Sequence, residues 1–167
     1  MTLSSVEIAP YTQNPLDLVE EIVEANDWAF DRHAPEELLV EVMGRWCQYR
    51  MFFFWQEEIS AMQFSCQFDL TVPPDRRTGV AELLAIINER LWLGHFDVDA
   101  DEALPMFRHT TLLRGAQGAS VEQMEDLMDI ALNECERFYP AFQFVIHAGH
   151  TAEQALAAAI LDTVAEA

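Results

Sequence analysis

The chain contains no lysine, and all nine of the basic side chains among its 167 residues are arginines. The absence of lysine excludes a Schiff-base lysine, a lysine general base and a Walker A phosphate loop. The formal net charge is −20, which argues against nucleic acid or an anionic membrane as partner, because phosphate binding needs a basic patch. We therefore expect no nucleic-acid partner and no membrane insertion, and we interpret the charge mainly as a source of solubility.

Cysteines are few, and long hydrophobic runs are missing. Cys47, Cys66 and Cys135 are widely spaced, odd in number and without C-x-x-C spacing, which favours reduced thiols over a disulfide framework. No apolar run reaches the roughly 18 residues that a membrane-spanning helix needs. The first eleven residues have neither the basic start nor the apolar core of a secretory signal. Together these features predict a cytoplasmic protein.

The common signatures of hydrolases and metal sites are also missing. The sequence has no G-x-S-x-G and no H-E-x-x-H motif. The acidic stretch 97–101 resembles the start of a calcium loop, but Glu102 stands where that loop needs glycine and Arg108 where it needs a bidentate glutamate. His147 and His150 have the spacing of a metal pair without an evident third ligand, so we favour surface histidines over a metal site. We expect no metal and no cofactor.

The run from Phe52 to Trp55 is the most informative feature that is present. Successive side chains of a strand point to opposite faces of a sheet, so three phenylalanines and a tryptophan in a row place aromatic surface on both faces. The chain's own helices can cover one face. The second face then needs another subunit, a bound segment or more of the chain, which indicates a binding surface.

Hydrophobic periodicity and turn residues divide the rest of the chain into helices and strands. Asn14 and Pro15 are typical of a helix start. Capping-box patterns begin at Ser120 and Thr151, and Pro140 is expected to kink or interrupt the helix that contains it. The expected elements are helices at 16–25, 74–91, 120–147 and 151–165 and strands at 28–31, 37–43, 47–55, 61–70, 94–99 and 104–113.

Two-residue turns at Gly44-Arg45 and Glu57-Glu58 would set the pairing of the three central strands. Val42 would then face Cys47, and Phe53 would face Met62. A slip of one residue would exchange the faces of a strand. The expected inner face carries Leu38, Val40, Val42, Tyr49, Met51, Phe53, Trp55, Met62, Phe64, Cys66 and Phe68. The expected outer face carries Leu39, Glu41, Met43, Trp46, Arg50, Phe52 and Phe54, mixed with glutamines.

Strands that come in blocks, rather than alternating singly with helices, predict an α+β fold with an antiparallel sheet. The helices should pack mainly on one face and leave the other available. We expect residues 1–13 to form a flexible N-terminal arm and residues 14–167 to form a single domain.

The segment from Asn88 to Phe96 joins the central helix to the next strand and has two interpretations. It could be a catalytic corner, with Glu89 and His95 as the acid/base pair. We favour a structural corner stopped by Gly94. In that case two side chains would hydrogen-bond to backbone, namely Asn88 and Arg90, and two would pack, namely Trp92 and Phe96.

This corner also carries a resemblance. The pattern Asn-Glu-Arg-x-Trp-x-Gly-x-Phe at 88–96, followed by Arg108-His109, resembles the YbjN family over about residues 14–165. The resemblance implies a bacterial sensory-transduction regulator whose fold is similar to the type III secretion chaperones. Those are small, acidic, dimeric α+β proteins that bind extended segments of a partner, so the resemblance implies cytoplasmic, non-enzymatic protein binding.

We therefore predict a regulatory or chaperone-like module, a homodimer that binds a partner polypeptide through its exposed sheet surface. The expected contact residues are Leu39, Met43, Trp46, Arg50, Phe52 and Phe54. One alternative is that the chain's own terminal segments cover this face. Another is a small-ligand binder or acid/base enzyme that uses the corner of Glu89, His95, Arg108 and His109. A third is a structural subunit of a larger assembly.

Overall fold

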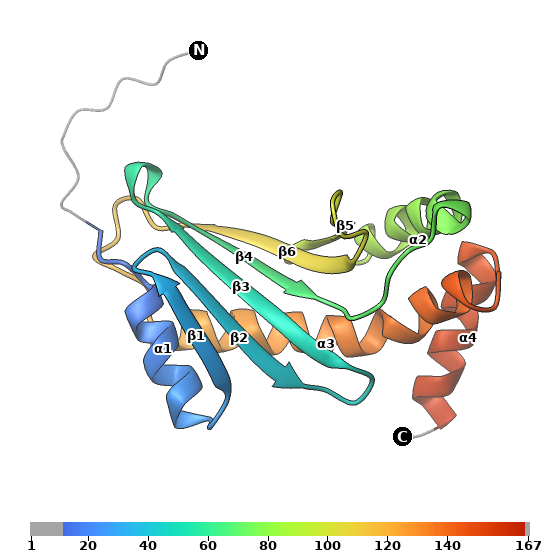
Figure 1. Ribbon diagram of the computed structural model, residues 1–167, viewed down its shortest axis with the longest axis horizontal. Coiled ribbons are helices and arrows are strands. Elements are labelled where there is room, and N and C mark those ends of the chain that lie inside the picture. The colour runs from blue at the N-terminus through green and yellow to red at the C-terminus, as the bar shows by residue number, and fades with distance from the viewer. Residues whose placement is uncertain (1–11, 166–167) are drawn as a thin grey trace, which may run out of the picture.

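Six antiparallel strands form one sheet in the spatial order β1-β2-β3-β4-β6-β5, shown in Figure 1. The computed structural model describes residues 12–165. The strands are β1 (Ala29–Ala34), β2 (Glu37–Met43), β3 (Gln48–Gln56), β4 (Ala61–Gln67), β5 (His95–Val98) and β6 (Pro105–Leu112). The helices are α1 (Leu16–Ala25), α2 (Arg77–Asn88), α3 (Val121–Ile146) and α4 (Ala152–Ala165). The predicted α+β class with an antiparallel sheet is confirmed.

The helices lie on one side of the sheet. In Figure 1, α1 and the long α3 run behind the strands, and α2 and α4 pack together at the β5 end. The apolar side chains of α1 and α3 bury the inner face of the sheet in one continuous core. Every residue predicted for the inner face, from Leu38 to Phe68, is buried. Within residues 12–165, none of the helices combines the length and apolar character needed to cross a bilayer.

The pairing register differs from the one predicted, yet the faces are unchanged. Val42 lies opposite Tyr49, not Cys47, and Phe53 lies opposite Phe64, not Met62. Both connections, 44–47 and 57–60, contain four residues between paired strand ends rather than two. Because each error is an even number of residues, every side chain in the paired strands keeps its predicted face.

Three helices begin just after the residues whose side chains were predicted to hydrogen-bond to their first turns. The Leu16 N–H donates to Asn14 Oδ1 at 2.9 Å, so the Asn14 side chain, just before the N-cap residue Pro15, satisfies the first N–H of α1. The Gln123 N–H donates to Ser120 Oγ at 3.1 Å, and the Ser120 N–H donates to Gln123 Oε1 at 2.9 Å. This reciprocal pair is the predicted capping box of α3, and a second box opens α4 at Thr151.

Of the two predicted effects of Pro140, a kink or an interruption, the interruption does not occur, because α3 continues through Pro140 to Ile146. Proline has no N–H, so it leaves the carbonyl of Glu136, one turn earlier, without its helical donor. The indole N–H of Trp46 donates to this carbonyl at 3.1 Å. A donor from the β2–β3 connection thus replaces the missing helical hydrogen bond.

The predicted N-terminal arm, residues 1–13, falls mostly outside the described residues. The two arm residues that are described contact the connection after β6. The Thr12 hydroxyl donates to the Leu113 carbonyl at 3.4 Å, and the Gln13 N–H donates to the Gln117 carbonyl at 2.9 Å.

Candidate functional site

The outer face of the sheet is the candidate site, because none of the described helices covers it. The register aligns its side chains in rows across the strands. One row consists of Leu39, Phe52, Ser65, Arg108 and His95, contributed in turn by β2, β3, β4, β6 and β5. A neighbouring row consists of Glu37, Phe54, Gln63 and Thr110.

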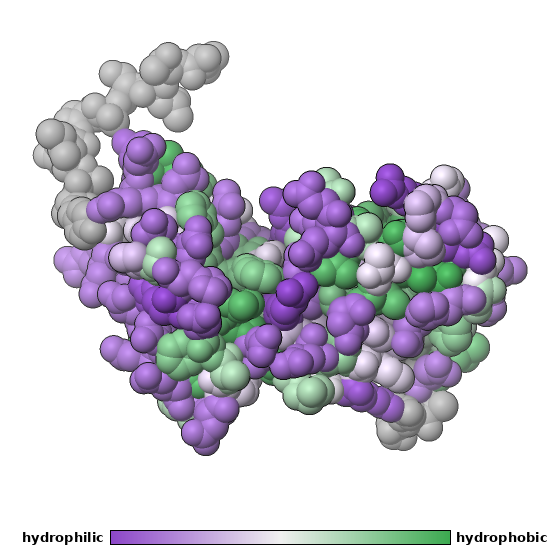
Figure 2. Space-filling view, in the orientation of Figure 1, coloured by the Kyte–Doolittle hydropathy of each residue, from purple (hydrophilic) through white to green (hydrophobic). Residues whose placement is uncertain are grey.

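Aromatic side chains lie near the middle of this face. Phe52 is half-buried, and 38% of Phe54 is exposed, although both project from a central strand. Met43, at the end of β2, is 75% exposed. Figure 2 views the molecule from this side and shows green, hydrophobic atoms among the purple polar surface. Large side chains that stay accessible at the centre of a sheet are typical of an interaction surface.

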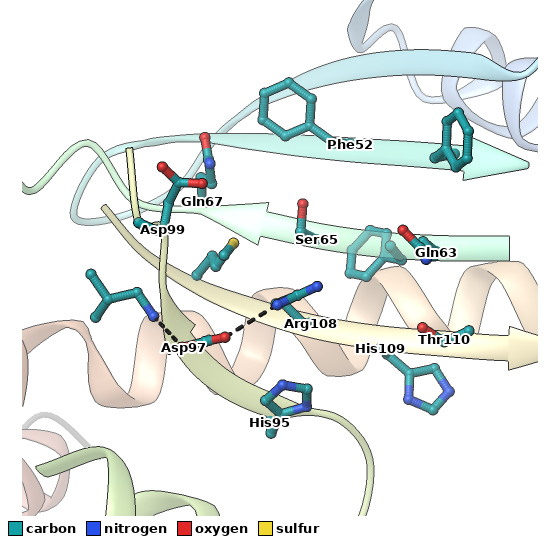
Figure 3. A pocket seen from close by; sticks show the side chains of 15 residues that line it. Phe52, Gln63, Ser65, Gln67, His95, Asp97, Asp99, Arg108, His109 and Thr110 are labelled. Carbon is teal, nitrogen blue, oxygen red and sulfur yellow. Dashed lines mark hydrogen bonds and ion pairs between the residues drawn. The ribbon is translucent and has the colours of Figure 1, made fainter. Parts of the chain in front are cut away.

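Phe52 and Phe54 border a groove of about 550 Å³. One wall is the sheet surface of β3, β4 and β6, and the other is β5 with the turn that follows it. Figure 3 shows Ser65 and Gln63 on β4, the strand next to Phe52, and Arg108 and Thr110 on β6, one strand farther away. Protein interfaces typically have an apolar centre surrounded by hydrogen-bonding groups, as this groove does.

Two arginines stand on this face, each held by a polar partner. Arg108 Nη1 lies 3.1 Å from Asp97 Oδ2, the ion pair that Figure 3 draws. Arg50 Nη2 lies 3.3 Å from Gln67 Oε1 and 3.5 Å from Glu102 Oε2. The Arg50 guanidinium also lies 5.8 Å from the centre of the Phe52 ring. These contacts orient both donors at the edge of the aromatic surface.

Trp46 does not lie on this face, and its predicted placement is wrong. It belongs to the β2–β3 connection and turns to the helix side, where its ring stacks on Tyr139 with 6.3 Å between ring centres. The residue parity that assigned it to the outer face does not hold in a four-residue connection, because only paired strand residues alternate. The other five predicted contact residues do lie on the outer face of the sheet, on strands β2 and β3. They are Leu39, Met43, Arg50, Phe52 and Phe54.

In the segment from Asn88 to Phe96, the predicted hydrogen bonding of the Asn88 side chain to backbone is confirmed. Asn88 Nδ2 donates to the Phe96 carbonyl at 3.0 Å, and the Phe96 N–H donates to Asn88 Oδ1 at 2.7 Å. The side-chain amide therefore pairs with the outer edge of β5 as another strand would. Phe96 is buried, as expected.

Other expectations for this corner are wrong. Trp92 does not pack and is fully exposed. Arg90 is exposed, and among residues 12–165 no hydrogen bond from its side chain to backbone is found. Glu89 is not among the residues that line the groove, whereas His95, Arg108 and His109 are. The predicted Glu89/His95 acid/base pair is therefore not assembled within this groove.

His109 is the titratable group of the groove whose environment is most altered. Burial lowers the pKa of His109, and the neighbouring His95 lowers it further. His95 shares the outer face with Asp97 and Arg108, whereas His109 lies opposite Phe64 of the inner face and reaches the groove lining from β6. The groove thus combines the imidazole of His95, an ion pair and aromatic surface. Within the described part of the chain, no cluster of three potential metal ligands occurs.

Sequence comparison identifies the family. The family model YbjN, described as "Putative bacterial sensory transduction regulator", matches residues 15–144. The chain belongs to the YbjN family. The match runs from α1 into α3 and includes both the open face and the Asn88–Phe96 corner of this YbjN-family chain.

A solved structure supports the same fold. The crystal structure of E. coli YbjN, described as "a putative transcription regulator", is similar with a TM-score of 0.50. The two chains are 14% identical over 71% of this chain and 84% of the other. No protein with a curated description matches the chain. At this identity the solved structure supports the fold alone, and the membership of the chain in the YbjN family rests on the family model.

Signals for several groove residues were missing from the sequence. Ser65 was not proposed as a contact, and Arg108 was proposed only for the alternative small-ligand corner, yet they are the next two residues after Phe52 across the sheet. The β4–β6 pairing that brings them together joins segments about forty residues apart. Local periodicity carries no information about such a pairing.

Proposed function

We propose that this YbjN-family protein is a non-enzymatic regulatory module that binds a partner polypeptide in the groove on its open sheet face. The observation that carries the proposal is the accessible pair Phe52 and Phe54 at the centre of a six-stranded sheet, bordering a groove of about 550 Å³. Aromatic rings at the centre of a sheet are normally covered by other parts of the same chain. The family's description as a regulator fits a role in binding rather than in catalysis.

The groove suits an extended polypeptide. Phe52 and Phe54 are two residues apart on one strand, so they present apolar contacts at the spacing at which an extended segment projects alternate side chains. Gln63, Ser65 and Thr110 add donors and acceptors beside them. Arg50 and Arg108 add oriented cationic donors, which would favour carbonyl or carboxylate groups of the partner. As in the type III secretion chaperones, we expect the functional unit to be a homodimer in the cytoplasm.

The test compares affinity purifications from extract of the source organism, using the tagged full chain and its Phe52→Asp/Phe54→Asp variant. We expect a polypeptide that the wild type retains and that the variant loses. Hot-spot aromatics contribute about 2 kcal/mol each, so the double change should weaken binding roughly 1000-fold. Both rings are accessible, so the variant should fold, as far-UV circular dichroism will check.

Ile59→Asp is the matched control, because Ile59 is 52% exposed at the β3–β4 connection and does not line the groove. It should retain the partner. Equal retention by the wild type and the groove variant, both folded, would refute the proposed site.

A small ligand in the same groove is the second candidate, and His95 beside the Arg108–Asp97 ion pair favours it. It predicts that His95→Gln or Arg108→Gln abolishes binding of a small molecule while polypeptide retention persists. Native mass spectrometry of the purified protein separates the two candidates, because a retained small molecule appears as a fixed mass increment.

A further inference from the structure

A second hollow, of about 310 Å³, lies between α2 and the β5–β6 turn, and we call it the α2 hollow. At the right of Figure 2, hydrophobic atoms reach the surface near the position that Figure 1 gives to α2. Sites for small molecules start at about 300 Å³ and are mostly apolar, with a few polar groups that orient the ligand. The α2 hollow has this composition. Its apolar lining includes Val72, Val80, Ala81, Leu84, Val98 and Ala103.

Backbone structure holds the walls of the α2 hollow in place. The Val72 N–H donates to the Ala103 carbonyl at 2.8 Å, so the segment before α2 is joined to the β5–β6 turn. Within the turn, the Ala103 N–H donates to the Asp99 carbonyl at 2.9 Å. Val80 and Leu84 lie one turn apart on α2 and belong to the opposite wall. A site with ordered walls loses little conformational entropy when a ligand binds.

Two opposite charges line the α2 hollow without pairing with each other. They are Arg77, the first residue of α2, and Asp99, in the β5–β6 turn. Among residues 12–165, the Arg77 guanidinium forms neither an ion pair nor a hydrogen bond. Asp99 Oδ1 accepts the N–H groups of Asp101 at 3.0 Å and of Glu102 at 2.6 Å. Asp99 Oδ2 has no partner in the same part of the chain, so both charges can bind a ligand.

We propose that the α2 hollow binds a free apolar α-amino acid of the size of leucine or methionine. The Arg77 guanidinium binds the carboxylate of the ligand, and Asp99 Oδ2 accepts a hydrogen bond from its ammonium group. The ligand side chain packs against the apolar wall that contains Val80 and Leu84. A volume of about 310 Å³ holds about ten non-hydrogen atoms at the roughly 30 Å³ that one water molecule occupies, which matches these amino acids.

The charge of the protein favours a zwitterion over a simple ion. The chain has a net charge of −20, so its field repels an anion that could otherwise bind to Arg77. A cation would be attracted to Asp99, but it would lie beside the unpaired Arg77, and like charges at a binding site lower affinity. An α-amino acid has no net charge and pairs with both groups at once.

The α2 hollow is distinct from the groove of the proposed function, although the two share the β5–β6 turn. Val98, Asp99 and Ala100 border both. Phe52 and Phe54 border the groove and not the α2 hollow. The proposal therefore does not depend on the proposed function. The Phe52→Asp/Phe54→Asp variant should bind the amino acid as the wild type does, and loss of binding in this folded variant would place the ligand in the groove and overturn the proposal.

Isothermal titration calorimetry of the full chain with L-leucine tests the proposal. We expect a dissociation constant on the order of 10–100 µM. Two probes each lack one charge of L-leucine: 4-methylpentanoate has no ammonium group, and L-leucinamide has no carboxylate. Each should bind about tenfold more weakly or worse, because each leaves one charged group of the protein unpaired.

Variants of the two charged residues locate the site. Arg77→Gln and Asp99→Asn should each raise the dissociation constant for L-leucine about tenfold or more. Asparagine keeps the oxygen that accepts the turn N–H groups, so Asp99→Asn should fold, as far-UV circular dichroism will check. Arg114→Gln and Asp101→Asn are the matched controls, because both residues are exposed and neither lines the α2 hollow. Both controls should bind L-leucine as the wild type does.

The outcomes separate the proposal from non-specific binding. If neither L-leucine nor L-methionine binds the wild type at concentrations up to about 10 mM, the proposal is overturned. It is also overturned if 4-methylpentanoate or L-leucinamide binds as tightly as L-leucine, or if Arg77→Gln and Asp99→Asn bind L-leucine normally. In the Arg77→Gln variant, L-leucine and L-leucinamide should bind with similar affinity, because the carboxylate has lost its partner.

Discussion

The hydrogen bond from Trp46 to Glu136 makes a measurable prediction about how α3 tolerates its internal proline. Replacement of Trp46 by phenylalanine keeps an aromatic ring against Tyr139 but removes the indole N–H that reaches the Glu136 carbonyl at 3.1 Å. Because Pro140 supplies no helical donor, that carbonyl is then left without a hydrogen bond. A buried carbonyl without a partner costs about 1–3 kcal/mol, and because this bond is partly buried we expect the free energy of unfolding to fall by about 1–2 kcal/mol.

A double-mutant cycle isolates this effect from the loss of indole packing. In a Pro140→Ala background, the new N–H at position 140 can donate to the Glu136 carbonyl, so the same Trp46→Phe change leaves no orphan. The cost of Trp46→Phe should then be smaller by about 1 kcal/mol, the net value of one backbone hydrogen bond. Cooperative urea unfolding followed by far-UV circular dichroism gives all four free energies.

Trp28→Phe is the control for the cycle. Trp28 follows α1 and packs against the core at the α1 end of the helical layer, away from Trp46 and Pro140. Its coupling to Pro140→Ala should be within about 0.3 kcal/mol of zero, as for distant sites. If Trp46 and Pro140 also show no coupling, the indole does not replace the helical donor and the explanation of the uninterrupted helix is wrong.

Two further predictions concern a glycine and the response to alkaline pH. Gly94→Ala should lower the free energy of unfolding by about 3 kcal/mol, because a Cβ there would lie 2.3 Å from Phe107 Cζ at a φ of +67°. Gly115→Ala, with a φ of +89° and no atom within 4 Å, should cost only about 1 kcal/mol, and an equal loss from both in thermal unfolding would contradict the steric argument. Burial raises the pKa of Cys47 to about 12 and also raises the pKa of Tyr49, which the charge of Cys47 raises further. The unfolded chain therefore loses these protons first, and the urea midpoint should fall as the pH rises above about 9, whereas a midpoint that stays constant would show that these groups ionise as readily when folded.

Much of the fold was predictable from local patterns. The alternation from Ala61 to Phe68 and the turn residues around the aromatic strand were sufficient to separate the faces of the central strands. The prediction survived two incorrect turn lengths because the side-chain period is 2 and both errors were even. Capping boxes at Ser120 and Thr151 predicted two helix starts, because a cap is a bond between residues three positions apart.

The candidate site was only partly predictable. Phe52 and Phe54 were assigned to the outer face correctly, since they belong to paired strand positions. Trp46 was assigned wrongly because it lies in a connection, where alternation no longer holds. Trp92 was expected to pack, since hydrophobicity is a property of the residue while exposure depends on which other segments approach it.

The sequence by itself determined the class of fold, the inner and outer faces of the central strands and the starts of the helices, because each depends on residues a few positions apart. Only the tertiary structure decided which strands pair at a distance, that a groove forms between the sheet surface and the β5–β6 turn, and that Trp92 stands uncovered. Those features depend on contacts between segments far apart in the chain, such as Ser65 with Arg108 or Trp46 with Glu136. No local period encodes such contacts, since they result from how the whole chain buries its apolar surface.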